Sequence, residues 1–325
     1  MWDNFLKSIN AVMPIFILVV LGYIFNKANL FSKAFYDDAE KFVFKIALPC
    51  QIFLSIISGA GRTDIADCTD LIVFTVIAVT VAFAVGLAFV PLIIKNNPVR
   101  GAVIQNCYRS NMAVLGLPLI GSIAGADGRF MISMLMPYAV TLFNVYTVIE
   151  LNIFAPQDAK KSPAKLVLSI VKSAVTNPLI IASVLGVVFL FSGITIPPEI
   201  GFVTDTLDAL SVCTEALVLI ALGAGFSFAA LRGKLRYSLP ASVYKTAVLP
   251  LVAVLVAHFG FGFVGVKLAT IFVTFGTPSA VSSYIMAKNM KSDGEVAGQI
   301  LLLSTVISTF TIFVGLFVLN TLGWL

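Results

Sequence analysis

Charged residues are scarce in this chain of 325 residues. Asp, Glu, Lys and Arg together make up 11% of it, whereas a soluble domain carries roughly a quarter. Hydrophobic residues reach 59%, and the mean hydropathy is +1.02. No polar stretch is long enough to form a separate soluble domain. These deficits exclude an ordinary soluble protein and indicate a single integral membrane domain with short loops.

Residues that serve catalysis or metal binding are also few. The one histidine, His258, lies at a predicted helix end, and the four cysteines show no CxxC or metal-ligand spacing. The sequence also lacks a Ser-His pair, a carboxylate pair and a basic stripe interleaved with aromatic residues. It therefore favours neither an enzyme nor a nucleic-acid-binding protein, and it predicts no cofactor. The coupling ion, H⁺ or Na⁺, is left open.

What the chain does contain is a series of apolar segments long enough to cross a bilayer. A transmembrane helix needs about 20 mostly apolar residues, and these segments do not show the period of two that is typical of barrel strands. We therefore predict an all-α integral membrane protein with ten transmembrane helices. The predicted spans are 11–27, 42–58, 71–94, 101–123, 129–152, 165–191, 207–229, 238–259, 266–288 and 296–320.

The distribution of basic residues predicts the orientation of these helices. With the N-terminus outside, fifteen of the 21 Lys and Arg residues fall in inner loops and helix ends. Four fall in outer ones, and two, Arg109 and Lys245, lie within spans. This asymmetry follows the positive-inside rule. It places both termini outside and explains the formal net charge of +5 by topology.

An internal repeat relates the two halves of the chain. Residues 14–25 (PIFILVVLGYIF) and 178–189 (PLIIASVLGVVF) share Pro, Gly and Phe at a constant shift of 164. Each half contains five predicted helices, an odd number, so the second copy would be inverted, as in many secondary transporters. We predict inverted repeats at 1–152 and 166–325, joined by a cytoplasmic linker at 153–165.

Two predicted helices carry a Gly-x-Pro sequence where the membrane crossing should be most apolar. Gly116-Leu117-Pro118 lies in the fourth span and Gly276-Thr277-Pro278 in the ninth. Proline removes a backbone hydrogen bond and clashes with the preceding turn, so we predict that both helices break there. Each second half would begin at its proline, with Thr277 as an N-cap. Two helix N-termini would then meet near mid-membrane, which is typical of an anion-binding centre.

Polar side chains gather around the two predicted breaks. For Asn111 and Arg109 a binding role is favoured over helix–helix hydrogen bonding, because they lie close to the first break. Arg109 precedes Pro118 by nine residues, or about 13 Å of helix, so it either lines the inward entrance or snorkels toward the cytoplasm. Lys245 has the same two interpretations, with snorkelling preferred. The predicted substrate-binding residues are Asn111, Leu117, Pro118, Leu119, Thr277, Pro278, Ser279, Arg109, Asn144 and Ser282.

Acidic residues inside the spans are few, and Glu150 and Glu215 are the main ones. No carboxylate pair flanks either predicted break, so the sequence shows no acidic sodium cage. Backbone carbonyls freed at the breaks could still hold sodium. Glu215 is a candidate for proton coupling, with an ordinary helix-end position as the alternative.

Three stretches resemble bacterial members of the auxin efflux carrier family. Residues 100–119, RGAVIQNCYRSNMAVLGLPL, are similar to the family's fourth-helix signature. TPSAVSSYIMA at 277–287 and GQILLLST at 298–305 are similar to its ninth and tenth helices, and the resemblance covers nearly the whole chain. Plant members insert a long loop where this chain has the short segment 153–165. The short loop is typical of bacterial relatives known as malate or malonate permeases.

The resemblance implies a fold like that of the bile-acid:sodium symporters. The first, second, sixth and seventh spans would form a scaffold that often makes a homodimer contact. The other spans would form a mobile transport domain that moves by an elevator mechanism, with substrate at the crossing of the fourth and ninth spans. The chain would be a multi-pass protein of the bacterial inner membrane. The residues that match the crossing by position are Asn111, Leu117, Pro118, Thr277, Pro278 and Ser279, while Arg109 matches a basic position of the bacterial pattern only.

These features together predict a secondary active transporter of a small organic anion in the lipid bilayer. The anion would be a mono- or dicarboxylate such as malate or malonate, or an auxin-like acid. The alternative is a sodium-coupled symporter of a larger amphipathic acid, of the bile-acid type. The sequence does not fix the identity of the acid or the direction of transport.

Overall fold

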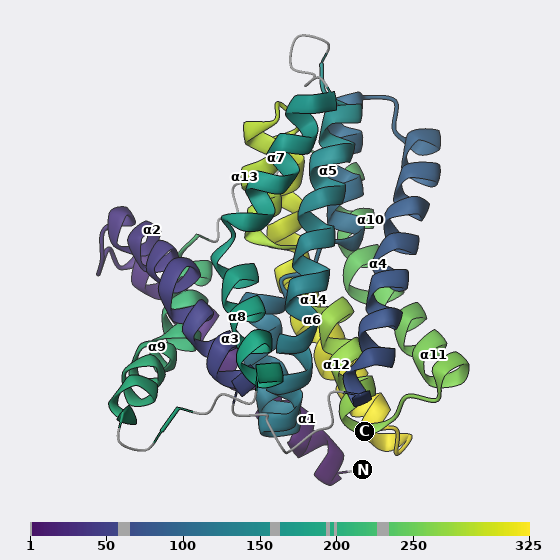
Figure 1. Cartoon of the computed structure of the whole chain (residues 1–325). Coiled ribbons are helices and arrows are strands. Elements are labelled where there is room, and N and C mark those ends of the chain that lie inside the picture. The colour runs from purple at the N-terminus through teal and green to yellow at the C-terminus, as the bar shows by residue number, and fades with distance from the viewer. Residues whose placement is uncertain (1, 58–65, 157–162, 193–195, 198–199, 226–233) are drawn as a thin grey trace.

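The computed structural model describes residues 2–57, 66–156, 163–192, 196–197, 200–225 and 234–325 (Figure 1). Every regular element in these residues is a helix, which confirms the all-α prediction. The two ends of the chain lie at the same end of the molecule (Figure 1). This placement is what an even number of crossings requires.

The helices follow one another from the N-terminus, and π-helices (η) interrupt the α-helices at three places in the described residues. Their bounds are α1 Trp2–Lys27, α2 Lys33–Phe42, η1 Val43–Ala47, α3 Leu48–Ile57, α4 Ala66–Ile93, α5 Asn97–Tyr108, η2 Met112–Gly116, α6 Leu117–Ile153, α7 Pro163–Val175, α8 Pro178–Ser192, α9 Phe202–Ala224, α10 Leu235–Val243, η6 Tyr244–Val248, α11 Leu249–Phe261, α12 Gly265–Gly276, α13 Val281–Asn289 and α14 Gly294–Thr321.

Long apolar helices mark a protein that spans a membrane. Within the described residues, four helical stretches are long and apolar enough to cross a bilayer: Cys68–Ile93, Asn97–Ile153, Leu235–Phe261 and Gly294–Thr321. Shorter apolar helices cover Ile17–Lys27, Pro178–Ser192 and Gly265–Gly276. Many large apolar side chains on these helices face outward, among them Leu92, Ile93 and Phe259. Such an exterior suits contact with lipid and not with water.

The long helix α6 folds back on itself near its start. Gly125 has φ +58° and ψ −139°, a backbone conformation essentially restricted to glycine. On either side of this turn, Ile132 packs beside Gly116 and Gly128 packs beside Ile120. The stretch Asn97–Ile153 therefore contains two antiparallel segments, as the predicted spans 101–123 and 129–152 require.

Each π-helix ends immediately before a Leu-Pro pair: Leu48-Pro49, Leu117-Pro118 and Leu249-Pro250. Proline cannot donate a backbone hydrogen bond, and its ring clashes with the carbonyl four residues earlier. The preceding turn widens in response. The N–H of Leu249 donates to the carbonyl of Tyr244, and the N–H of Leu48 donates to that of Val43, five residues back in each case. These prolines are thus accommodated within continuous helix.

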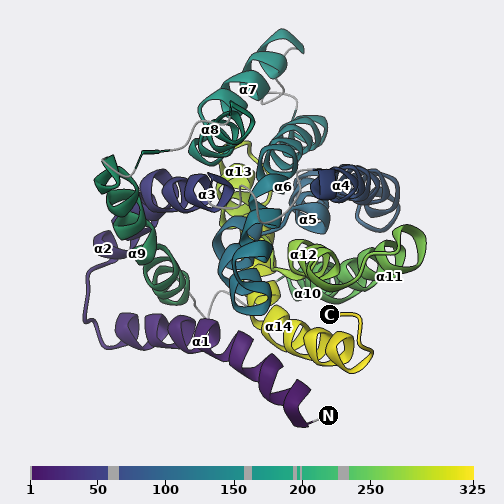
Figure 2. The same ribbon diagram turned by 60° about the horizontal axis from the view of Figure 1, so that its bottom comes forward.

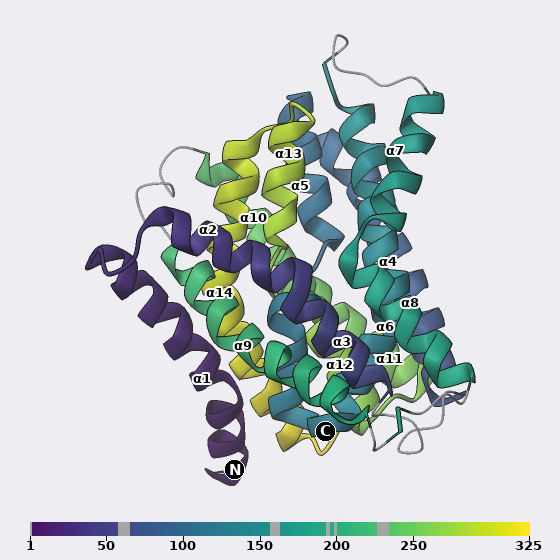
Figure 3. The ribbon, with the colours of Figure 1, turned by 60° about the vertical axis from the view of Figure 1, so that its left-hand side comes forward.

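The helices pack into two groups. The first group contains α1, α2, α3, α8 and α9, and the second contains α4, α5 and α10 to α14 (Figures 1 and 2). Figure 3 shows the first group from its outer side, with α1, α2, α3 and α9 toward the viewer. Helix α6 contacts both groups, and α1 also packs against α14. A site beside α6 can therefore be lined from both groups.

Helices α1 and α9 cross at two glycines. A Cβ atom added at Gly22 would overlap the carbonyl oxygen of Ile220, and one added at Gly223 would overlap that of Val19. The two backbones therefore touch, in the small-residue packing that is common between membrane helices. The side-chain amide of Asn26 donates to the carbonyl of Ala224 at 2.8 Å and secures the same crossing.

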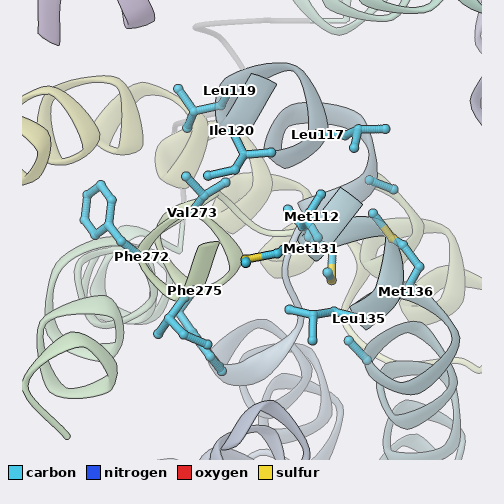
Figure 4. Packing of buried hydrophobic residues seen from close by; sticks show 14 of the residues in the cluster. Met112, Leu117, Leu119, Ile120, Met131, Leu135, Met136, Phe272, Val273 and Phe275 are labelled. Carbon is cyan, nitrogen blue, oxygen red and sulfur yellow. The ribbon is translucent and has the colours of Figure 1, made fainter. Parts of the chain in front are cut away.

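An apolar core holds the start of α6 against α12. Figure 4 shows this packing: Leu119 and Ile120 lie beside Val273 of α12, and Leu117 lies on the other side of Met112. Met131, from the returning segment of α6, lies between Val273 and Met112 (Figure 4). The core fixes the place at which the chain segments before α6 and after α12 can meet.

Candidate functional site

Two interruptions of helix meet in the interior of the fold. The first, at residues 109–111, separates α5 from η2, and the second, at residues 277–280, separates α12 from α13. The backbone N–H of Asn111 donates to the carbonyl of Pro278 at 2.9 Å. This bond joins the two breaks directly and satisfies one backbone group that each of them releases.

Serine and threonine side chains strengthen this crossing. The hydroxyl of Ser110 donates to the carbonyl of Thr274. Because that bond uses the single hydroxyl proton of Ser110, the Thr277 hydroxyl donates in the contact between these two side chains. The hydroxyl of Ser279 donates to the side-chain oxygen of Asn106. The crossing is thus held by backbone and side-chain bonds between segments from opposite halves of the chain.

The first break lies earlier than the sequence predicted. We expected it at Gly116-Leu117-Pro118, but η2 absorbs Pro118, and the helix continues from Met112 into α6 without interruption. Leu117, Pro118 and Leu119 are buried in this helix. The prediction that the helix breaks at Pro118 is therefore wrong. Pro118 and Pro278 are not equivalent, since only Pro278 lies in a break.

The prediction that Thr277 caps the N-terminus of the second half-helix is also wrong. Thr277 follows the last residue of α12, and α13 begins only at Val281, after Ala280. Thr277 has φ −64° and ψ 149°, the extended geometry that a residue before proline favours. Pro278 is accordingly part of an extended linker between the two half-helices and not the first residue of α13.

A buried lysine caps the end of α12. Lys245, on η6, is fully buried, and its ammonium donates to the carbonyls of Phe275 at 2.7 Å and Thr277 at 2.8 Å. The last carbonyls of a helix lack intrahelical partners and carry partial negative charge, so a cation is favourable there. The prediction that Lys245 snorkels to the interface is therefore wrong, because its ammonium lies at the second break.

Arg109 lies in the first break, and its side chain is 5% exposed. Its guanidinium has four neutral partners: Ser282 Oγ at 2.9 Å, Asn144 Oδ1 at 3.0 Å, Thr147 Oγ1 at 3.1 Å and Met286 Sδ at 3.0 Å. No carboxylate in the described part of the chain forms an ion pair with it. The alternative that Arg109 snorkels toward the cytoplasm is wrong, because the break is at Arg109 itself and its guanidinium is buried there.

Asn111 adds a donor without a partner. Its side chain is buried, and within the described residues nothing accepts a hydrogen bond from its amide nitrogen Nδ2. Leaving such a donor unpaired costs about 1–3 kcal/mol. The unpaired donor lies next to a buried guanidinium that forms no ion pair with a carboxylate of the described residues.

A cavity of about 150 Å³ lies between these groups. Met112 and Ala113 line it at the start of η2, and Ala280 and Ser282 line it at the start of α13. Because the first N–H groups of a helix have no intrahelical partner, both helix starts bring donors and partial positive charge to the cavity. Side chains from the first helix group, Phe44 of η1 and Leu179 of α8 among them, complete the wall.

The structure separates the predicted binding residues into three sets. Arg109, Asn111, Asn144 and Ser282 line the cavity. Thr277, Pro278 and Ser279 form the crossing, while Leu117, Pro118 and Leu119 belong to buried helix and are not among the lining residues. Glu215, the residue predicted for proton coupling, is on α9, and its side chain lies outside the part of the structure that is described.

Sequence reasoning did not identify Thr147 and Met286 as partners of Arg109. A usable signal was present in the spacing of the polar residues. Asn144 and Thr147 are three residues apart, and Ser282 and Met286 are four apart, so each pair shares one face of a helix. Both faces converge on Arg109 in the structure.

Comparisons with known proteins agree with the sequence resemblance. The model of a family described as membrane transport protein matches residues 7–316. An uncharacterized transporter of Methanothermobacter thermautotrophicus is 22% identical over 307 residues, which cover 94% of this chain and 96% of that protein. An uncharacterized transporter of Methanocaldococcus jannaschii is also 22% identical over 307 residues, covering 93% and 96%. The relatives indicate a transporter and not an enzyme, and because the family model matches nearly the whole chain, this chain belongs to the membrane transport protein family.

Proposed function

We propose that this protein is a secondary carrier of a small organic anion, which binds between Arg109 and Asn111 at the crossing of the two broken helices. The observation that carries the proposal is the buried guanidinium of Arg109, whose side-chain partners are all neutral. A buried charge is costly unless it is paired, and ionisable residues inside membrane proteins mark functional sites. A substrate carboxylate supplies the ion-pair partner that the guanidinium lacks among the described residues.

The size of the cavity supports a small acid. Its volume of about 150 Å³ equals the share of roughly five water molecules in the liquid. Pockets for drug-sized ligands are larger, roughly 300–1,000 Å³. A mono- or dicarboxylate such as malonate or malate therefore suits the site better than the larger amphipathic acid of the bile-acid alternative.

The contacts of Lys245 argue against a sodium ion at the second break. Unwound backbone carbonyls often coordinate the coupling sodium in transporters. Here the carbonyls of Phe275 and Thr277 already accept hydrogen bonds from the Lys245 ammonium. A sodium ion that used these oxygens would have to displace a tethered cation. We propose that transport does not use sodium at this place, which leaves the proton as the favoured coupling ion.

We further propose ten transmembrane helices in two inverted repeats, 1–152 and 166–325. The first helix group would be the scaffold, and the second group with α6 would be the moving domain. The helices of each group pack mainly with one another, and both groups line the cavity. These two features support elevator-type alternating access, in which one group slides past the other. The homodimer, the bacterial inner membrane and the outside position of both termini stay predictions.

The proposal is tested by substrate exchange. Purified protein is reconstituted in liposomes loaded with unlabelled malonate, and labelled malonate is added outside without any ion gradient. We expect saturable entry of label with the wild-type protein and none with Arg109→Gln. The matched control, Arg129→Gln, changes an arginine on α6 that does not line the cavity, and it should exchange like the wild type.

Two results would count against the proposal. Normal exchange by Arg109→Gln would show that the anion does not depend on this guanidinium. Exchange of an amphipathic acid but of no small carboxylate would favour the bile-acid alternative.

A further inference from the structure

A second buried ionisable group, Glu150, lies one helical turn from the partners of Arg109. It is on α6, three residues after Thr147, which is about 4.5 Å of rise along the same face. The hydroxyl of Thr147 accepts a hydrogen bond from Arg109 at 3.1 Å and lies 2.9 Å from that of Tyr108. Glu150 therefore lies one helical turn beyond the hydrogen bonds of the Arg109 guanidinium, although it does not line the cavity.

The surroundings of Glu150 satisfy neither of its protonation states. The residue is fully buried, and neither carboxyl oxygen has a partner within hydrogen-bonding distance among the described residues; the Tyr108 hydroxyl acts on the carboxyl from farther away. An unpaired neutral carboxyl and an unpaired carboxylate are both costly in an apolar interior, the carboxylate far more so. A buried acid without a structural bond inside a membrane protein needs another reason to be there.

Among the described residues, the groups that interact electrostatically with Glu150 belong to one segment. They are Cys107 and Tyr108 at the end of α5 and Arg109 immediately after it. Arg109 is the cation among these groups. The other buried cation, Lys245, interacts with Cys107 but is not among the groups that act on Glu150. Two carboxylates that share one cation repel each other, so a proton on one of them becomes favourable when both are present. Whatever compensates Arg109 therefore decides whether Glu150 holds a proton.

We propose that Glu150 is the proton-binding site that couples anion transport to proton transport, an inference that rests on the proposed function. In the empty carrier, ionised Glu150 balances the charge of Arg109. When one substrate carboxylate pairs with Arg109, Glu150 takes up one proton from water, so Arg109, Glu150 and the paired carboxylate together keep zero net charge. A second carboxylate, as in malonate, adds its own charge to the site. On the other side of the membrane the anion leaves and Glu150 releases the proton. Anion and proton thus move in the same direction, one proton for each anion.

The position of Glu150 suits this exchange with water. α6 ends at Ile153, whose side chain is 48% exposed, and the N–H of Phe154 donates to the backbone carbonyl of Glu150 at 3.0 Å. Glu150 therefore lies within one turn of an exposed helix end on one side and one turn from Thr147 on the other. We propose it in place of Glu215, which the sequence had suggested.

The test separates coupling from binding. Wild type, Glu150→Gln and Glu150→Asp are reconstituted in liposomes with the membrane potential held at zero, and labelled malonate is followed in two assays. In exchange without gradients, all three should be active. In the second assay the outside of the liposomes is made acidic. Wild type and Glu150→Asp should then raise malonate inside to about ten times its outside concentration for each pH unit of gradient, because one proton moving with each anion makes the two concentration ratios equal. Glu150→Gln should not accumulate it.

A control and a direct proton count complete the experiment. Glu295→Gln changes an exposed glutamate at the start of α14 and should accumulate like the wild type. Proton uptake by detergent-solubilised wild type on malonate binding, read with a pH indicator in weak buffer, should be one proton per anion. This count decides the question even if Glu150→Gln does not fold.

The outcomes are distinguishable. Accumulation by Glu150→Gln at the wild-type level, or binding without proton uptake, would overturn the role of Glu150 and leave the carrier function standing. A wild type that exchanges neither malonate nor another small carboxylate would overturn the proposed function, and this inference with it.

Discussion

The backbone N–H of Asn111 donates to the carbonyl of Pro278 at 2.9 Å, and this bond joins two helix breaks from opposite halves of the chain. Other backbone groups at the breaks also have hydrogen-bond partners. The N–H of Ser279 donates to Ser304 Oγ at 3.1 Å, and the carbonyls of Phe275 and Thr277 accept from the Lys245 ammonium. Among the described residues, the unpaired groups at the crossing include the side-chain amide of Asn111, which lines the cavity beside the guanidinium of Arg109. This amide and the guanidinium are the donors that would bind an anion.

Replacing Asn144 with aspartate should disable the site without changing its shape. The Asn144 side chain accepts a bond from Arg109 at 3.0 Å, so the new carboxylate would form the ion pair that the guanidinium lacks. Malonate would then lose a charge-assisted hydrogen bond worth about 1.5–3 kcal/mol, which is roughly 10- to 150-fold in affinity. Equilibrium binding of labelled malonate measures the effect. Asn320→Asp, on α14, is the control, and unchanged affinity of Asn144→Asp would refute the role given to Arg109.

Replacing Lys245 with methionine should destabilise the protein. The change leaves the carbonyls of Phe275 and Thr277 without a donor, at about 1–3 kcal/mol each. Thermal unfolding in detergent should therefore shift to clearly lower temperature. Lys267→Met is the matched control, because the pair of Lys267 with Asp70 at 2.8 Å is partly exposed and worth at most about 1 kcal/mol. Equal melting of the two variants would contradict the capping role of Lys245.

The glycine crossing of α1 and α9 gives a prediction for stability. Gly22→Ala and Gly223→Ala each place a methyl group on a backbone carbonyl of the other helix, and neither backbone can yield without separating the helices. Each variant should lower the unfolding temperature in detergent. Gly260→Ala, near the end of α11, meets no atom closer than 3.9 Å and should be neutral or slightly stabilising. If all three variants melt alike, α1 and α9 do not pack as described.

The two prolines singled out in the sequence should behave differently on mutation. Pro278→Leu places a larger side chain in the buried linker at the crossing and should abolish malonate exchange. Pro118→Ala, in continuous helix next to the π-turn, should retain it because Pro118 does not line the cavity. Exchange assays in liposomes, with membrane insertion checked by yield, compare the two. Equal loss in both variants would support the original prediction of equivalent breaks.

Much of the fold could be predicted from the sequence, because apolar length and flanking charge decide where membrane helices lie. Helices α4 and α14 overlap the predicted spans 71–94 and 296–320, whereas α2, Lys33–Phe42, lies almost entirely between two predicted spans. The break near Pro278 was also predictable, since an extended residue before proline is a local preference.

The place of the first break could not be predicted from proline. Pro118 leaves its helix intact because the chain widens into η2, an adjustment that depends on the whole turn and not on one residue. The real break, at 109–111, contains neither proline nor glycine. Its signal is the polar run Gln105 to Asn111 inside an apolar segment. Gln105, Ser110 and Asn111 of this run hydrogen-bond to the other broken helix. Local sequence does not encode that pairing.

The position of the bound anion can be measured in crystals grown with bromomalonate, from the anomalous signal of bromine. The proposal predicts one strong peak in the cavity between Arg109 and Asn111, absent from Arg109→Gln crystals grown in the same way. A different result would be a peak in the larger apolar cavity of about 250 Å³ lined by Phe89, Arg236 and Tyr244. Occupancy there, with the crossing empty, would contradict the assignment of the crossing as the anion site.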